Sequence, residues 1–331
     1  MKKLLYILVG TLLLSGCSSE PVADTDFLLN TVSTITIYDE SSSKKPGEII
    51  DECFSLCRDY ENMLSKTIKT SEVSAINNAD GQAVSVSDDT AELLNLAVEY
   101  SEISDGKFDI TISPAAELWN FTAEEPKVPS ESEIEKAAEK INYKNIEIHG
   151  TDVTLKGEGT AIDLGGIAKG YIADKATDFL IENDVEKAIV NLGGNIYVIC
   201  PEDDEKGFTI GIQEPFAPSG TLYGTVNLKN GSVVTSGVYE RGFEENGVRY
   251  HHILDPKTAR PVENNLYSVT IIAPSSARAD ALSTTCFALG LEEGLKLISE
   301  TDGVEAVFIT DDMQYHLSDG AESIYNFTKT E

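Results

Sequence analysis

Asp280 and Thr284 are a first pair of residues whose types and spacing suit chemistry. They are four residues apart in a segment whose apolar pattern predicts a helix over residues 277–289, capped by Ser276. Side chains at this spacing share one face of a helix. A carboxylate and a hydroxyl are hard oxygen ligands, which suit Mg²⁺ better than zinc. An acid placed favourably on the helix dipole, beside a threonine that only packs, is the alternative interpretation.

His251 and His252 precede Asp255-Pro256, and the chain has only 4 histidines. A histidine can act as a general base near neutral pH. The pattern predicts a strand over residues 250–254, and alternation along a strand sends the two rings to opposite faces. At most one of them therefore faces a given site. A polar strand residue whose ring makes one hydrogen bond is the alternative.

Residues 159–170 contain a glycine pair between a predicted strand end and a predicted helix start. Residues 160–164 are expected to end an apolar strand that carries Asp163, the Gly165-Gly166 pair follows, and residues 167–180 have helical spacing. A strand, a glycine pair and a helix start can turn backbone N–H groups toward a phosphate. The spacing does not match the dinucleotide-binding pattern G-x-G-x-x-G. An ordinary tight turn between a strand and a helix remains the alternative.

The sequence predicts a fold that contains both helices and strands. The chain has 331 residues, and its strands and helices follow no regular βαβ alternation, so we expect an α+β fold with mixed, largely antiparallel sheets and flanking helices. Ser130 and Glu133 have the spacing of a capping box, and Trp119 is expected in the core. Strands are expected at 28–38, 146–148, 153–155, 188–192, 196–199, 208–212, 222–228, 233–236, 267–273 and 306–309, and further helices at 48–64, 71–77, 88–104 and 293–299.

The charge of the chain excludes some partners. With 25 basic and 56 acidic side chains, the formal net charge is −31. Nucleic acids need cations opposite their phosphates, so we expect no nucleic-acid binding. Docking on an anionic membrane through protein charge is disfavoured for the same reason.

The N-terminus resembles a bacterial lipoprotein signal. Lys2-Lys3 and the apolar run 4–14 precede Leu14-Ser15-Gly16-Cys17, which is similar to a lipobox. We expect a signal peptide over residues 1–16, lipidation of Cys17, a tether over residues 17–26 and a domain over residues 27–331. This predicts an anchor on the extracytoplasmic face of a cell membrane. An ordinary secretory signal with a chance cysteine is the alternative.

The other cysteines are interpreted mainly as core residues, whose disulfide pairing the sequence does not determine: Cys53, Cys57, Cys200 and Cys286.

Several stretches together resemble the ApbE-type FAD:protein FMN transferases, which are exported flavin-handling lipoproteins. They occur in the family's order and span almost all of the mature chain. Two positions depart from the family pattern. Leu29-Asn30-Thr31 replaces Met-Gly-Thr, and Ala259 replaces a glycine, where a turn requiring positive φ would be more costly. The matching pieces are Ser65 with residues 71–77, then residues 108–111, 161–170, 191–194, 236–237, 239–241 and 252–256, and finally residues 279–280 with Thr284.

The resemblance implies an ApbE/T-fold-like architecture and a Mg²⁺-dependent reaction with FAD as substrate. In it, FMN passes from FAD to a Ser or Thr hydroxyl of a target protein as a phosphoester, and AMP is released. Carried over, Asp280, Thr284 and an oxygen of Thr160 would bind Mg²⁺, and His252 would be the base. The FAD site would be lined by Leu29, Ser65, Lys66, Thr67, Asp109, Asp163, Gly166 and Leu254.

The resemblance also implies a separate acceptor protein. The chain itself lacks the Asp-Gly-x-(Ser/Thr)-Gly-Ala-Thr pattern associated with flavinylated targets of the family. We therefore expect the acceptor to be another exported protein of a flavin-based electron-transfer system. Two alternatives remain: an FAD pyrophosphatase that yields FMN and AMP, and a lipoprotein that binds flavin without catalysis.

Overall fold

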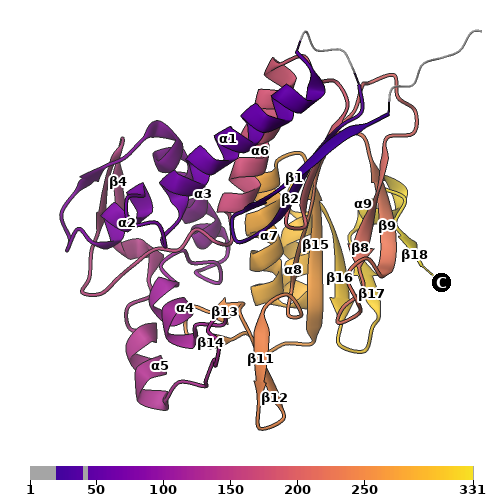
Figure 1. Ribbon diagram of the computed structural model, residues 1–331. Coiled ribbons are helices and arrows are strands. Elements are labelled where there is room, and N and C mark those ends of the chain that lie inside the picture. Colours follow the sequence, from indigo (N-terminus) through magenta and orange to yellow (C-terminus); the bar gives the residue numbers. More distant parts are fainter. Residues whose placement is uncertain (1–19, 40–43, 331) are drawn as a thin grey trace, which may run out of the picture.

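The computed structural model describes residues 20–39 and 44–330, and within them an eight-stranded sheet is the main element (Figure 1). Each strand of this sheet pairs with its neighbours in antiparallel fashion, which confirms the expected α+β class. In sheet order the strands are β1 (Val22–Leu28), β2 (Thr31–Ile37), β6 (Ala188–Leu192), β7 (Asn195–Ile199), β10 (Gly231–Gly237), β15 (Leu266–Ala273), β16 (Glu305–Thr310) and β17 (Tyr315–Leu317).

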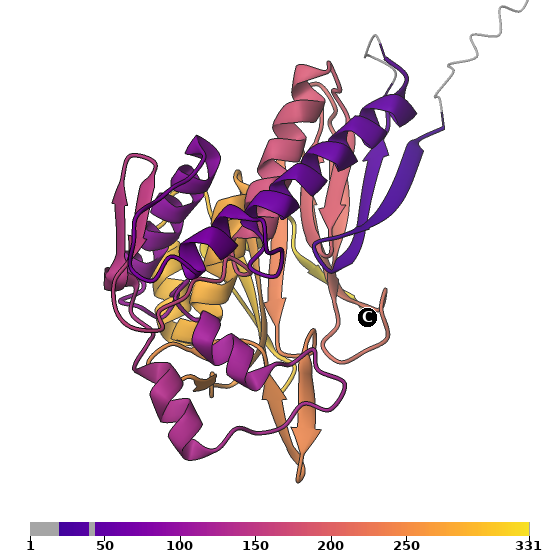
Figure 2. The ribbon, with the colours of Figure 1, turned by 60° about the vertical axis from the view of Figure 1, so that its left-hand side comes forward.

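Both faces of this sheet are covered, as Figures 1 and 2 show. Strand β15 is accordingly buried almost throughout rather than at alternate residues. The largest apolar core fills the space between the sheet and the helices α1 (Pro46–Leu64), α6 (Ala168–Glu182), α7 (Ser276–Leu289) and α8 (Leu291–Ser299). A second core lies under the small sheet of β8 (Phe208–Gln213), β9 (Leu222–Leu228) and β18 (Thr328–Lys329), close to β17 and α9 (Asp319–Ser323).

The remaining elements lie beside and below α6 and α7 in the view of Figure 1, and Figure 2 shows the same two groups from another side. Trp119 is 1% exposed in a third apolar cluster with Ile134, Leu254 and Ala259, as expected for a core tryptophan. The capping box of Ser130 and Glu133 is also confirmed. These elements are α2 (Glu72–Asn77), β3 (Val84–Ser85), α3 (Asp88–Ile103), α4 (Ser113–Trp119), α5 (Glu131–Ala138), η1 (Tyr143–Asn145), β4 (Ile146–His149), β5 (Asp152–Leu155), β11 (Gly242–Glu245), β12 (Val248–His251), β13 (Leu254–Asp255) and β14 (Arg260–Pro261).

Two expectations need correction. Residues 22–26 of the expected tether belong to β1, an edge strand whose polar side chains pair with their surroundings, as the Asp26–Arg58 ion pair illustrates. Residues 160–164 are not a strand; apart from one parallel bridge between Ile112 and Ala161, they have no sheet partner among the described residues. The N–H and carbonyl of Ile162 bond to a side chain instead, as described below.

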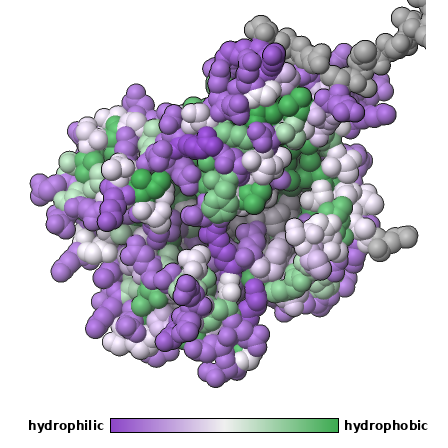
Figure 3. All heavy atoms as spheres, in the orientation of Figure 1, coloured by the Kyte–Doolittle hydropathy of each residue, from purple (hydrophilic) through white to green (hydrophobic). Residues whose placement is uncertain are grey.

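The predicted signal peptide 1–16, Cys17 and residues 18–19 lie outside the described residues. None of the helices formed by residues 20–39 and 44–330 has the length and apolarity needed to cross a membrane. Cys53, Cys57, Cys200 and Cys286 are buried free thiols, which agrees with their interpretation as core residues. Figure 3 shows one face of the molecule, where hydrophobic side chains form small groups separated by hydrophilic ones.

Candidate active site

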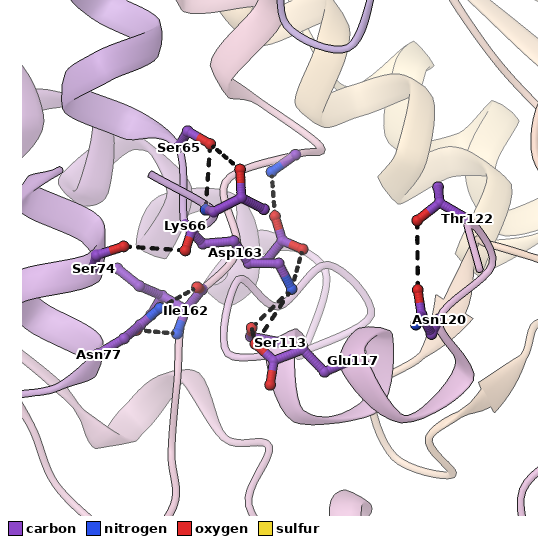
Figure 4. Close-up of polar contacts among 12 residues, drawn as sticks. Ser65, Lys66, Ser74, Asn77, Ser113, Glu117, Asn120, Thr122, Ile162 and Asp163 are labelled. Atoms are coloured by element: carbon purple, nitrogen blue, oxygen red, sulfur yellow. Dashed lines mark hydrogen bonds and ion pairs between the residues drawn. The ribbon is translucent and has the colours of Figure 1, made fainter. Parts of the chain in front are cut away.

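The segment before the glycine pair is held by the side chain of Asn77 at the end of α2 (Figure 4). The Asn77 amide donates to the Ile162 carbonyl at 2.9 Å and accepts from the Ile162 N–H at 2.7 Å. One residue on, the Asp163 N–H donates to the Ile110 carbonyl at 2.7 Å. The Asp163 carboxylate then accepts from the Gly165 N–H at 2.9 Å. These bonds replace a strand ladder and fix where the turn begins.

Lys66 carries a positive charge to the same turn (Figure 4). Its Nζ lies 3.1 Å from a carboxylate oxygen of Asp163 and donates to the Ser113 hydroxyl at 3.0 Å. Ser65 and Thr67 on either side share a hydrogen bond of 2.9 Å between their hydroxyls. The structure thus brings four of the predicted FAD-site residues together: Ser65, Lys66, Thr67 and Asp163.

The start of α6 lies against α7, and this contact brings the glycine turn to the predicted metal pair. A Cβ on Gly166 would lie 3.6 Å from the Thr284 hydroxyl. The Gly170 N–H donates to the Asp280 carboxylate at 2.9 Å. Asp280 is 4% exposed, and burial raises its pKa, an effect that the nearby charge of Lys169 opposes. The structure therefore brings the glycine turn, with Gly166, next to the predicted metal pair of Asp280 and Thr284.

His252 follows the last residue of β12 and is half-buried. Its Nδ1 lies 3.2 Å from the Arg241 carbonyl oxygen. A carbonyl only accepts, so this contact places the ring proton on Nδ1 and leaves Nε2 free to take a proton. Removal from water lowers the pKa of His252 to about 4, and the charges of Arg241 and Lys169 act in the same direction. The ring is therefore neutral at pH 7.

His251 differs in its surroundings. Its Nε2 contacts the Val262 carbonyl at 3.0 Å, and its ring lies edge-on to Phe287 in the core. This is the polar strand residue with one ring hydrogen bond that the sequence left as the alternative. Of the two adjacent histidines, His252 is the one whose pKa responds to Lys169, which also acts on Asp280.

The other predicted residues have their own surroundings. The Thr160 hydroxyl is directed to the Lys140 carbonyl and the Asn145 amide, so a metal contact from Thr160 would use its backbone carbonyl. Asp109 is buried, and its carboxylate accepts from the backbone of residues 111 and 143. Leu254 packs in the Trp119 cluster. Leu29 occupies the β1–β2 turn at φ 55, and its N–H donates to Glu61. Their contacts with FAD stay predictions.

Sequence reasoning assigned no role to Lys169, although it lies within the central stretch. Its charge acts on the pKa of the Asp280 carboxyl and of the His252 ring, and also on that of the Glu240 carboxyl. A lysine placed one turn after a glycine pair is a residue type that pairs with phosphate. That signal was present in the sequence and could have identified Lys169.

The donor set suits Mg²⁺. The described residues contain no cluster of three or more acidic, histidine or cysteine side chains that could enclose a metal. Asp280 and Thr284 instead offer one carboxylate and one hydroxyl. Mg²⁺ is commonly bound by one or two carboxylates, with water and substrate phosphates completing its shell. The residues present therefore fit this ion in company with a phosphate ligand.

Comparison with known proteins gives a consistent result. The model of the ApbE family matches residues 29–308. An FAD:protein FMN transferase of Klebsiella pneumoniae (strain 342) is 37% identical over 268 residues, covering 80% of this chain and 83% of that protein. One of Treponema pallidum (strain Nichols) is 32% identical over 311 residues, covering 89% and 86%.

Solved structures agree. The ApbE protein of Thermotoga maritima msb8 superposes with a TM-score of 0.85 at 33% identity, covering 94% of this chain and 100% of that chain. The flavin transferase ApbE of Vibrio cholerae superposes with a TM-score of 0.83 at 25% identity, covering 92% and 99%. The mixed fold with largely antiparallel sheets is therefore shared with these proteins.

Proposed function

The chain belongs to the ApbE family, and from this premise we propose how its residues carry out the family's reaction. The protein is an FAD:protein FMN transferase: it moves FMN from FAD to a target protein. A bond forms between the acceptor hydroxyl oxygen and the phosphorus on the FMN side. The pyrophosphate P–O bond breaks, and AMP leaves.

Asp280 and Thr284 would hold Mg²⁺ with their side chains, and Thr160 with its backbone carbonyl. When bound, the ion neutralises pyrophosphate charge and stabilises the negative charge that develops on AMP. A protein with a net charge of −31 needs such local cations to accept FAD. Lys66 and Lys169 add positive charge at the two ends of the glycine turn.

His252 would act as the general base. Its Nε2 accepts the proton of the acceptor hydroxyl while the Arg241 carbonyl holds Nδ1–H and fixes the ring. The backbone N–H of Gly166 is proposed to donate to a phosphate oxygen, since the Gly165 N–H is already bonded to the Asp163 carboxylate. The FAD site is proposed to be lined by Leu29, Ser65, Lys66, Thr67, Asp109, Asp163, Gly166 and Leu254.

The acceptor is proposed to be a second exported protein with a sequence like Asp-Gly-x-(Ser/Thr)-Gly-Ala-Thr, part of a flavin-based electron-transfer system.

We also propose that Cys17, after removal of residues 1–16, carries the lipid that anchors the enzyme outside the cytoplasm. Cell fractionation tests the anchor: the wild-type protein should be found with membranes, and the Cys17→Ser variant should not. Equal membrane association of the two would exclude lipidation at Cys17.

One observation supports the proposal above the others. The Gly170–Asp280 bond joins the glycine turn to the metal pair, and Lys169 beside it acts on both Asp280 and His252. These contacts support the proposal that the residues for metal, phosphate and base functions act in one region.

The test mixes the purified protein with FAD, Mg²⁺ and an acceptor carrying the motif. Flavin fluorescence that stays on the acceptor in a denaturing gel, and that EDTA abolishes, is expected. Free FMN and AMP without labelled acceptor would instead identify a pyrophosphatase. FAD binding with no turnover would identify a non-catalytic flavin protein.

A further inference from the structure

Asp174, on α6, makes an unusual set of contacts with the first turn of α7. One carboxylate oxygen accepts from the Ser276 N–H at 2.7 Å. The other accepts from the Ala277 N–H at 2.9 Å and from the Ser275 hydroxyl at 2.8 Å. The first N–H groups of a helix have no partner within it, and a negative charge there is favoured by the helix dipole. Here Asp174, which belongs to a different helix, supplies both the hydrogen-bond acceptors and the negative charge.

The contact is reciprocal. While Asp174 of α6 binds the start of α7, Asp280 of α7 accepts from the N–H of Gly170 in the first turn of α6. Gly170 and Asp174 are four residues apart and share a face, as are Ser276 and Asp280. Two carboxylates, each on one helix and each bound to the backbone of the other, therefore define how α6 and α7 lie against each other.

Between these hydrogen bonds, the backbones of α6 and α7 pack directly against each other. A Cβ on Gly170 would lie 2.3 Å from the Ser276 carbonyl oxygen and 2.7 Å from the Ala277 Cα. The Ser276 hydroxyl lies 2.8 Å from that of Ser232 on β10, which fixes the same turn to the sheet. The first turn of α7 is thus held from two sides.

A helix is stiff over two turns, so the position of its first turn sets the position of side chains four and eight residues later. For α7 these are Asp280 and Thr284, counted from Ser276. We infer that Asp174 is a positioning residue for the metal pair: by binding the first turn of α7, it sets where the Asp280 and Thr284 oxygens lie relative to the Gly165–Gly170 turn. The inference rests on the proposed function, because it concerns the ligands proposed there for Mg²⁺.

The experiment compares the wild type with Asp174→Asn and Asp174→Ala. Asp178→Asn is the matched control, because it removes one negative charge from an exposed position one turn further along α6. Two quantities are measured against Mg²⁺ concentration: the rate of FMN transfer, and the thermal unfolding temperature with FAD present. FAD binding without metal is followed by flavin fluorescence.

Loss of a residue that orients a metal ligand typically weakens metal affinity by about 10- to 100-fold. Asp174→Ala should therefore raise the Mg²⁺ concentration for half-maximal transfer, and for half of the thermal shift, by about 10-fold or more. Asp174→Asn keeps one acceptor oxygen and should fall between. Asp178→Asn should match the wild type, and metal-free FAD binding should be similar in all four proteins.

A lower unfolding temperature with unchanged Mg²⁺ midpoints in both Asp174 variants would overturn the inference, since Asp174 would then be structural only. If Asp174→Ala does not fold, the midpoint of Asp174→Asn decides. Transfer by the wild type that does not depend on Mg²⁺, or that Asp280→Asn leaves unchanged, would also overturn it. That result would locate the failure in the proposed metal site rather than in Asp174.

Discussion

His252 is held by a backbone carbonyl rather than by a carboxylate. The Arg241 carbonyl fixes the ring and its tautomer, while the cations near the ring disfavour a second proton. A base built in this way is neutral over a wide pH range, although it gains no extra basicity from an acidic partner.

Replacement of His252 by alanine should abolish FMN transfer while FAD still binds, because the ring takes a proton and is not needed to hold the cofactor. General-base contributions are about 100- to 10,000-fold, so the rate should fall at least that far. His251→Gln is the adjacent control and should retain most activity. Transfer at the wild-type rate by His252→Ala would remove the ring from the mechanism.

The lowered pKa of His252 predicts an unusual acid limit. Its pKa falls from 6.5 to about 4, so the neutral form is favoured by folding. The neutral ring contributes stability fully above pH 6.5, and this contribution is lost as pH falls toward 4. The acid limb of kcat/KM should accordingly lie well below pH 6.5, as measured with saturating Mg²⁺. A limb at the ordinary pKa of histidine would show that the ring is solvated in the working enzyme.

Among the elements, the segment between Ala161 and Leu164 depends on α2. Asn77 satisfies both the N–H and the carbonyl of Ile162, and Figure 4 shows this clasp beside the Lys66–Asp163 pair. Without it, two largely buried backbone groups lose their partners, which costs about 1–3 kcal/mol for each unsatisfied group.

Asn77→Ala should therefore lower the free energy of unfolding by about 2–6 kcal/mol, since two groups lose their partners. It should also weaken FAD binding, because Asp163 follows the clasped residue directly. Denaturant unfolding and FAD titration measure the two effects. Asn78→Ala is the control, since its amide bonds only the Ser74 carbonyl at the end of α2. Equal FAD affinity in Asn77→Ala and the wild type would mean that the turn is positioned without the clasp.

The crossing of α6 and α7 depends on the absence of a side chain at Gly170. Gly170→Ala forces a Cβ into the Ser276 carbonyl and should destabilise the fold by about 1–3 kcal/mol, with a higher Mg²⁺ requirement for transfer. Gly47→Ala makes the same change in α1, where a Cβ meets nothing within 4 Å, and should be neutral or stabilising. Thermal unfolding of both variants tests this. Equal stability of the two variants would show that α7 can move away from a Cβ at position 170 without destabilising the fold.

Elements with regular apolar spacing could be predicted from the sequence, because burial of one face decides their structure. This holds for α1, α3, α6 and the β6–β7 pair around Gly193-Gly194. Residues 160–164 could not, because the backbone of Ile162 pairs with the side chain of one asparagine 85 residues earlier in the chain. Strand β1 was missed because its exposed, charged face has the composition of a tether.

The site shows the same division. Asp280 and Thr284 could be paired from their spacing alone, and their place beside Gly166 required the fold. The departure at Ala259 predicted a costly turn if that position needed positive φ, and the residue does have φ 54, buried and bonded through its carbonyl to Trp119. The contacts of Asp174 with α7 carry no sequence signal, since they join two helices a hundred residues apart.

The proposed site is built from three distant parts of the chain. The glycine turn belongs to the start of α6, the metal pair to α7, and His252 to the end of the β11–β12 hairpin. Basic side chains are scarce, since the chain has only 25 of them. Lys169 and Arg241 are nevertheless close enough to His252 to lower its pKa, and Lys66 pairs with Asp163 at the glycine turn. FAD should therefore bind where these cations lie.

A crystal structure of the protein with FAD and Mn²⁺, used for its anomalous scattering in place of Mg²⁺, would locate the metal and the pyrophosphate. We expect an anomalous peak within bonding distance of the Asp280 carboxylate and the Thr284 hydroxyl. The pyrophosphate should lie between that peak and the Gly165-Gly166 turn, with the FMN-side phosphorus facing His252 Nε2. A pyrophosphate bound elsewhere, or a metal ion that contacts neither Asp280 nor Thr284, would contradict the proposed site.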